Sequence, residues 1–154
     1  MYRQAEYKLF EDRIDKIIYK TNLPFLKEKH IKSFYSSHIS YIDHVIITKE
    51  YFIAVKSTQL FNQPSNIDIN NFRLCVNDLS KILNKRIVGI FLSLKEPTLE
   101  AIESIKFEKD NFILIYNLDH KKLENEFIKC LHLNEIYIYD ENNVYMLGNN
   151  IDLL

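Results

Sequence analysis

The segment Tyr41–Ser57, with the sequence YIDHVIITKEYFIAVKS, contains two runs of β-branched and aromatic residues. Such runs favour β-strands, and the short charged step Lys49-Glu50 between them is typical of a turn. The segment therefore predicts two adjacent strands, at 41–48 and 51–57, that pair as a hairpin.

The sequence on either side of this hairpin predicts helices and further strands. Residues 3–20 place apolar side chains on one stripe and charged ones elsewhere, as an amphipathic helix does. For residues 27–40 we expect a helical turn that leads into a first strand. Further along, the expected helices cover 67–84, 97–107 and 121–131, the expected strands 87–94 and 112–116, and a hairpin 135–147. Helices that alternate with apolar strands predict a three-layer α/β/α domain with a central mixed sheet.

Length and composition indicate one domain, spanning residues 1–154, because 47% of the residues are hydrophobic. The 20 basic and 21 acidic residues nearly cancel, so a nucleic-acid partner would need a local basic patch. Gly89 and Gly148 are the only glycines, which excludes the glycine-rich loops that bind phosphate. Cys75 and Cys130 lie too far apart for a CxxC zinc motif. No apolar run approaches the roughly 18 residues of a membrane span, and we expect a cytoplasmic protein.

Two charged residues interrupt the apolar hairpin. Asp43 stands in the first strand, and Lys56 stands near the end of the second. A charge in an apolar strand is costly unless it has a partner, a metal ion or an altered pKa. Because side chains alternate along a strand, Ala54 and Lys56 share one face, which Asp43 can also reach across the hairpin. A carboxylate beside a lysine on neighbouring strands is typical of divalent-metal phosphodiesterases.

The same residues carry a resemblance to a known family. The string IDHVIITKEYFIAVKST, residues 42–58, resembles the catalytic hairpin of the PD-(D/E)xK nuclease superfamily, most closely that of its nuclease-related domain (NERD). Phe10-Glu11 is similar to the start of Mrr-type restriction endonuclease-like domains, and residues 86–123 are similar to the strands and helices that close their core. The resemblance covers residues 5–128, and the C-terminal helix and hairpin occupy 121–147.

The resemblance implies a restriction-endonuclease-like fold and metal-dependent hydrolysis of nucleic acid, with DNA preferred over RNA as substrate. It assigns Mg²⁺, or alternatively Mn²⁺, to Asp43, the Val55 backbone carbonyl and Glu11. It gives Lys56 the role of positioning the attacking water, and it places a second catalytic acid at position 54. Many nucleases of this kind are homodimers, and an edge strand or the C-terminal hairpin could support one here.

Position 54 departs from the family pattern, because alanine stands where the second acid is expected. Three explanations are open. Ala54 could be an engineered replacement of a glutamate, the domain could have lost catalysis naturally and only bind nucleic acid or protein, or Asp68 or Gln59 could be a substitute ligand. With alanine at this position, we expect the chain as it stands to be nearly inactive.

The polar neighbours of these residues have plainer explanations. In a regular strand, His44 points to the face opposite Asp43, which favours a core or interface histidine over a catalytic base. Ser57, Thr58 and Gln59 could contact a nucleic-acid backbone, although polarity at a strand end explains them equally well.

Overall fold

The computed structural model describes residues 2–20, 23–32, 39–48, 51–58, 63–106, 112–132 and 144–146. The helices are α1 (Tyr2–Lys20), α2 (Asn66–Leu83), α3 (Leu99–Lys106) and α4 (His120–His132). The strands are β1 (Phe25–Lys32), β2 (Ile39–Ile47), β3 (Phe52–Ser57), β4 (Ile87–Ser93), β5 (Phe112–Tyr116) and β6 (Val144–Met146). All four expected helices and the four expected strands between residues 41 and 116 are confirmed, with ends that shift by two residues at most.

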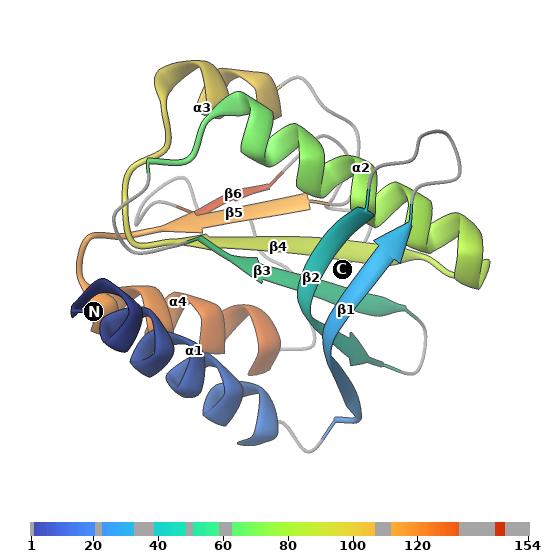
Figure 1. Ribbon diagram of the computed structural model, residues 1–154, viewed down its shortest axis with the longest axis horizontal. Coiled ribbons are helices and arrows are strands. Elements are labelled where there is room, and N and C mark those ends of the chain that lie inside the picture. Colours follow the sequence, from blue (N-terminus) through green and yellow to red (C-terminus); the bar gives the residue numbers. More distant parts are fainter. Residues whose placement is uncertain are drawn as a thin grey trace.

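The strands form one six-stranded mixed sheet in the order β1-β2-β3-β4-β5-β6. The β1–β2 and β2–β3 pairs are antiparallel, the β3–β4 and β4–β5 pairs are parallel, and β6 closes the sheet antiparallel to β5. Helices α2 and α3 each connect two parallel strands in the same direction across the sheet. Because such crossovers are nearly always right-handed, both helices lie on one face, and α1 and α4 cover the other (Figure 1). The three-layer α/β/α architecture is thereby confirmed.

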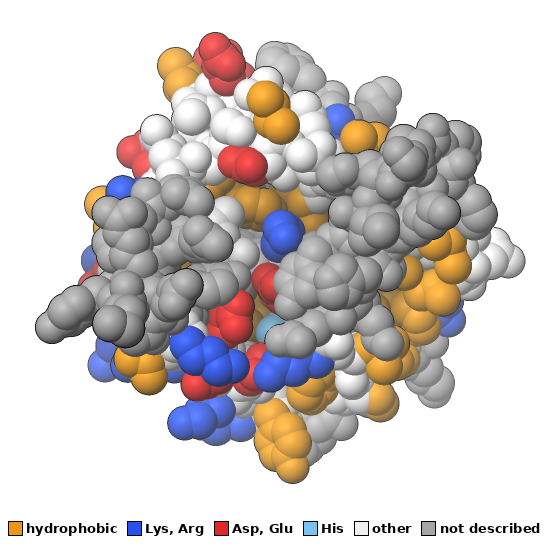
Figure 2. Space-filling view, in the orientation of Figure 1, with side chains coloured by type: hydrophobic (Ala, Val, Ile, Leu, Met, Phe, Trp, Pro, Cys, Tyr) orange, Lys and Arg blue, Asp and Glu red, His pale blue; other side chains and the backbone are white. Residues whose placement is uncertain are grey.

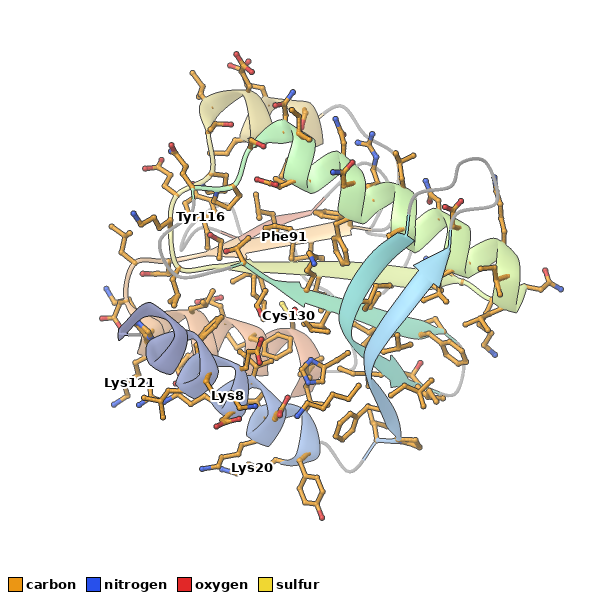
Figure 3. The ribbon with its side chains drawn as sticks, viewed as in Figure 1. Lys8, Lys20, Phe91, Tyr116, Lys121 and Cys130 are labelled. Carbon is orange, nitrogen blue, oxygen red and sulfur yellow. The ribbon has the colours of Figure 1, made fainter. Side chains whose placement is uncertain are left out.

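Each face of the sheet has its own hydrophobic core. The core under α1 and α4 includes Phe10, Ile14, Val55, Phe127 and Cys130. The core under α2 and α3 includes Ile42, Ala54, Phe72, Cys75 and Phe91. Figure 3 shows Phe91 and Cys130 on these opposite sides. Strand β4 is buried along its whole length, as the apolar sequence IVGIFLS predicts.

Helix α2 is fixed tightly at both ends. Ser65 is its N-cap, and the side chains of Ser65 and Asp68 form a reciprocal capping box with each other's backbone N–H. At the other end Asn84 adopts a left-handed conformation, with φ at 49°, and its N–H bonds back to the last turn. A Cβ atom at Gly89 would lie 3.2 Å from the Phe72 ring, so glycine lets α2 approach β4 closely.

The expected helical turn from residue 27 and the expected hairpin at 135–147 do not agree with the structure equally well. The helical turn expected from residue 27 onward is wrong for residues 25–32, which form strand β1 at the sheet edge. The turn of the expected C-terminal hairpin, about residues 141–143, lies outside the described residues, and β6 pairs with β5. None of the described helices has the length and apolar character needed to cross a membrane.

Candidate active site

Strand β2 leaves β3 at Asp43. The β2–β3 ladder runs from the pair Ile47–Phe52 to the pair His44–Val55. Beyond it, the backbone N–H of Ser57 donates a hydrogen bond to Asp43 Oδ2 over 2.7 Å, and the Ser57 hydroxyl donates to the same oxygen over 3.2 Å. The carboxylate thus takes the place of the backbone carbonyl that a continued β2–β3 ladder would offer to Ser57. Strand β2 stays paired with β1, and the two strands curve away from β3 together (Figure 1).

Burial changes the acidity of Asp43. The residue is 6% exposed. Its pKa is raised above the ordinary 3.8 mainly because burial penalises the charged form. The backbone hydrogen bond from Ser57, the nearby charges of Lys56 and His44, and the Ser57 hydroxyl act in the opposite direction and lower the pKa in part. Lys56 therefore lies close enough to Asp43 to influence its charge.

Helix α1 brings a second carboxylate to the same place. A cavity of about 10 Å³ lies between α1 and the β2–β3 junction. Its lining residues are Glu11, Ile14, Asp15, Lys27, Asp43, His44 and Ser57. A volume of this size accommodates about one water molecule or one small ion. Glu11, which the resemblance assigned to the site, therefore shares the cavity with Asp43.

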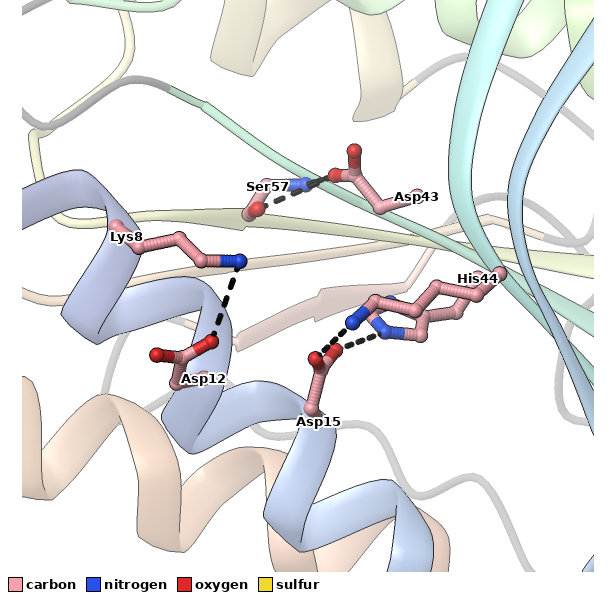
Figure 4. Close-up of polar contacts among 7 residues, drawn as sticks. Lys8, Asp12, Asp15, Asp43, His44 and Ser57 are labelled. Carbon is pink, nitrogen blue, oxygen red and sulfur yellow. Dashed lines mark hydrogen bonds and ion pairs between the residues drawn. The ribbon is translucent and has the colours of Figure 1, made fainter. Parts of the chain in front are cut away.

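Asp15 joins three elements of the site (Figure 4). One carboxylate oxygen bonds His44 Nε2, and the other pairs with the Lys27 ammonium. Among the described residues, no group pairs with His44 Nδ1, although this atom is buried. Figure 2 shows acidic and basic side chains gathered around a histidine on this face of the molecule. The histidine side of the cavity is thus held in place by α1 and β1 together.

The expectation that His44 points away from Asp43 is wrong. Ile42 and Val45 both pack in the core under α2, although side chains three residues apart in a regular strand face opposite sides. The alternation therefore slips between them, and both Asp43 and His44 turn toward α1, where each lines the cavity. This slip lies where β2 separates from β3, and the strand sequence by itself carries no sign of it.

The expectation that Ala54 and Asp43 face a common surface is also wrong. Ala54 is fully buried in the apolar core under α2, whereas Asp43 lines the cavity under α1. Val55 lies opposite His44 in the last pair of the ladder, and its side chain packs in the core under α1. Lys56 follows at the end of β3 and is partly exposed.

Asp68 and Gln59 were considered as ligands that could replace the acid missing at position 54, and the structure describes only Asp68. Asp68 serves the capping box of α2, where its carboxylate accepts from Ser65, so a structural role accounts for it. Gln59 lies outside the described residues. Asp15 was not predicted as a site residue, although it stands four residues after Glu11 and hence on the same face of α1. That spacing is the signal that could have identified it.

The donor atoms allow a test of metal binding. No group of three or more His, Cys, Asp and Glu side chains suited to a metal ion occurs within the described part of the chain. A preformed all-protein metal cage is therefore not present there. Mg²⁺, however, commonly binds through one or two carboxylates, with water and substrate phosphate as its other ligands. Asp43 and Glu11 around a water-sized cavity fit this mode of binding.

Comparisons with known proteins give only distant likenesses. No family model matches the chain, and no curated protein matches it. The crystal structure of a protein of unknown function, AF1548, superimposes with a TM-score of 0.47 at 9% identity, over 62% of this chain and 52% of that one. A repair endonuclease from Pyrococcus abyssi gives a TM-score of 0.37 at 12% identity, over 52% of this chain and 34% of that one. The chain thus matches about half the length of the first structure and a third of the second, and the fold described above is defined by its own sheet order and register.

Proposed function

We propose that this chain has the site of a metal-dependent nuclease that acts on DNA. The observation that supports this function is the buried Asp43 carboxylate, which shares a cavity with Glu11 and lies near Lys56. Keeping a carboxylate in a desolvated position lowers stability, and such perturbed acids cluster at functional sites. The resemblance of residues 42–58 to the PD-(D/E)xK superfamily, and the mixed sheet that surrounds them, agree with this proposal.

Each residue has a distinct role in the proposal. Asp43 and Glu11 would hold Mg²⁺, or Mn²⁺ in its place, because both prefer oxygen ligands. The ion would supply Lewis-acid stabilisation of the charge that develops on the phosphate. Lys56 would position the attacking water and add positive charge beside it. Ser57 fixes the Asp43 carboxylate through two hydrogen bonds to one oxygen, and the other oxygen points away from Ser57 (Figure 4).

The alanine at position 54 limits this activity. A second acid would ordinarily complete the ligand set, and here its place is an apolar core position. We therefore expect very slow cleavage by the chain as it stands. The further expectations that it forms homodimers to address both DNA strands, and that it acts in the cytoplasm, belong to the same proposal.

The test compares this chain with Asp43→Asn and Glu11→Gln, which keep the shape of each side chain but remove its charge, and with Ala54→Glu. Each protein is incubated with supercoiled and linear DNA, with and without Mg²⁺ or Mn²⁺. We expect this chain to cut slowly and only with metal, and Asp43→Asn and Glu11→Gln to lower that rate by about tenfold or more. Ala54→Glu should not raise the rate, because its carboxylate would enter the apolar core under α2. Circular dichroism and thermal melts establish that each variant is folded.

A second function, binding without hydrolysis, is favoured by the packing of Ala54. Its side chain fits an apolar core in which a glutamate carboxylate would be costly to bury, as expected if alanine is the natural residue. In that case the chain would bind nucleic acid or a protein through a nuclease-like surface. Tight DNA binding by this chain, combined with no metal-dependent cleavage, would replace the enzyme proposal with this one.

A further inference from the structure

A second, larger cavity lies beside the candidate active site. It has a volume of about 370 Å³, within the roughly 300–1,000 Å³ that small-molecule sites usually occupy. Its lining residues come from the C-terminal half of α1 and from β1: Asp15, Lys16, Tyr19, Lys20, Phe25 and Lys27. None of the residues assigned to catalysis lines it, so it needs an explanation of its own.

The lining combines two aromatic rings with positive charge. The Tyr19 side chain is 74% exposed, and the Phe25 side chain is partly buried. Three lysines surround these rings, against a single acid, Asp15, which already pairs with Lys27 and His44. Lys16 and Lys20 stand one helical turn apart on α1, and Figure 3 shows Lys20 at the end of that helix. The cavity therefore suits a ligand that is flat and apolar in one part and anionic in another.

The cavity adjoins the candidate active site. Asp15 and Lys27 line both cavities. The Phe25 ring also contacts the His44 ring, with centroids 6.0 Å apart. A polymer chain whose phosphate lies near Asp43 and Lys56 could thus place a neighbouring unit in the larger cavity without leaving the surface.

We propose that the cavity between α1 and β1 is a subsite for one unpaired base of a single-stranded DNA segment. The base stacks on Tyr19 and Phe25, and the adjoining phosphates lie against Lys16 and Lys20. Aromatic rings with basic side chains are the usual means of binding single strands, because every base has a stacking face. The inference rests on the proposed function for its choice of DNA, and it adds that the strand is unpaired next to the cleavage site.

Binding without divalent metal tests the subsite apart from catalysis. Fluorescence anisotropy is measured with a labelled single strand of about 12 thymidines, a length within the usual range of single-strand sites. A second strand carries the same phosphates but abasic sugars, and a third probe is a blunt duplex. We expect the thymidine strand to bind more tightly than the abasic strand.

Variants at Tyr19 separate stacking from charge. Tyr19→Ala should weaken binding of the thymidine strand by roughly 5- to 100-fold, to the level of the abasic strand. Tyr19→Phe keeps the ring and should bind like the unaltered protein. Leu9→Ala removes another exposed apolar side chain of α1, outside the cavity, and should leave binding of all three probes unchanged. Lys20→Ala should weaken both strands and reduce the salt dependence of binding.

The outcomes distinguish the subsite from the proposed function. If Tyr19→Ala binds thymidine strands normally while duplex binding persists, the subsite is overturned and the nuclease proposal stands. A ¹⁵N chemical-shift titration with a thymidine dinucleotide gives an independent measurement. Shifts confined to residues 16–20 and 25–27 would support the subsite even if no DNA is cut. Absence of shifts there, together with equal binding of the thymidine and abasic strands, would overturn it.

Discussion

The two faces of the sheet are built from the same strands but differ in chemistry. The buried side chains of β2 and β3 that face α2 are apolar, among them Ile42, Val45 and Ala54. On the face toward α1, the same strands present Asp43, His44 and Ser57. On the face toward α2, these strands bury apolar side chains, whereas on the face toward α1 they also hold polar groups away from water. Stability is thus expected to depend on apolar packing on both sides, and on the α1 side on charge and hydrogen bonding as well.

The largest effect is expected from truncating Phe72 on the α2 side. Its ring packs against Phe91 and Phe112, with centroids 5.7 and 5.4 Å away. Phe72→Ala should lower the free energy of unfolding by about 3–5 kcal/mol, because the cavity it leaves cannot close fully. Leu74, on the exposed side of the same helix, provides the control, and Leu74→Ala should stay within about 0.5 kcal/mol. Urea unfolding measures the free energy of unfolding of both variants. Equal losses for the two variants would contradict the assignment of Phe72 to the core.

A smaller loss is expected from Asp15 on the α1 side. Asp15→Ala leaves the buried His44 Nε2 without its acceptor and Lys27 without its carboxylate, at a cost of about 1–3 kcal/mol. Asp15→Asn retains an oxygen acceptor and should recover part of that loss. Asp12→Ala removes only an exposed pair with Lys8, 3.5 Å long, and should cost less than about 0.5 kcal/mol. If Asp12 and Asp15 give the same value, the polar network is not a stabilising feature of this face.

Local patterns in the sequence were sufficient for most of the fold. The runs at 41–48, 51–57 and 87–94 are apolar and β-branched, and the helices between them carry a clear apolar stripe, so each element could be predicted separately. Strand β1 could not, because the sequence FLKEKHIK is rich in lysine. Lysine is common in edge strands such as β1, where it discourages pairing with other chains. A lysine-rich sequence therefore does not distinguish an edge strand from a helical turn.

The candidate site was harder to predict than the fold. Asp43 was found because a charge in an apolar strand is conspicuous, and Glu11 was found through the family resemblance. Asp15 and His44 depend on how α1 lies across β2 and on a slip in strand alternation. These are tertiary features, and the spacing of Asp15 from Glu11 is the one local sign of them. The same slip separates Ala54 from Asp43, which regular alternation had placed together.

The smallest effect, and the most specific to the α1 side, is the contribution of Asp43 to the pH dependence of the free energy of unfolding. Its pKa in the folded protein is raised above 3.8, mainly by burial, so at pH values between that figure and the raised pKa the folded state binds more protons than the unfolded state. Stability must then fall as the pH rises through this window and level off above the folded pKa. Asp43→Asn keeps an oxygen acceptor for Ser57 but carries no charge.

Asp43→Asn should therefore gain stability relative to the unaltered protein as the pH rises from about 4 to neutrality, because only the unaltered protein must bury an anion. Thermal melts of both proteins across this range measure the difference. If the difference instead narrows with rising pH, the hydrogen bonds from Ser57 and the charge of Lys56 stabilise the anion more than burial destabilises it. The carboxylate would then be a structural anchor of the β2–β3 junction, and the contrast between the two faces would be one of hydrogen bonding alone.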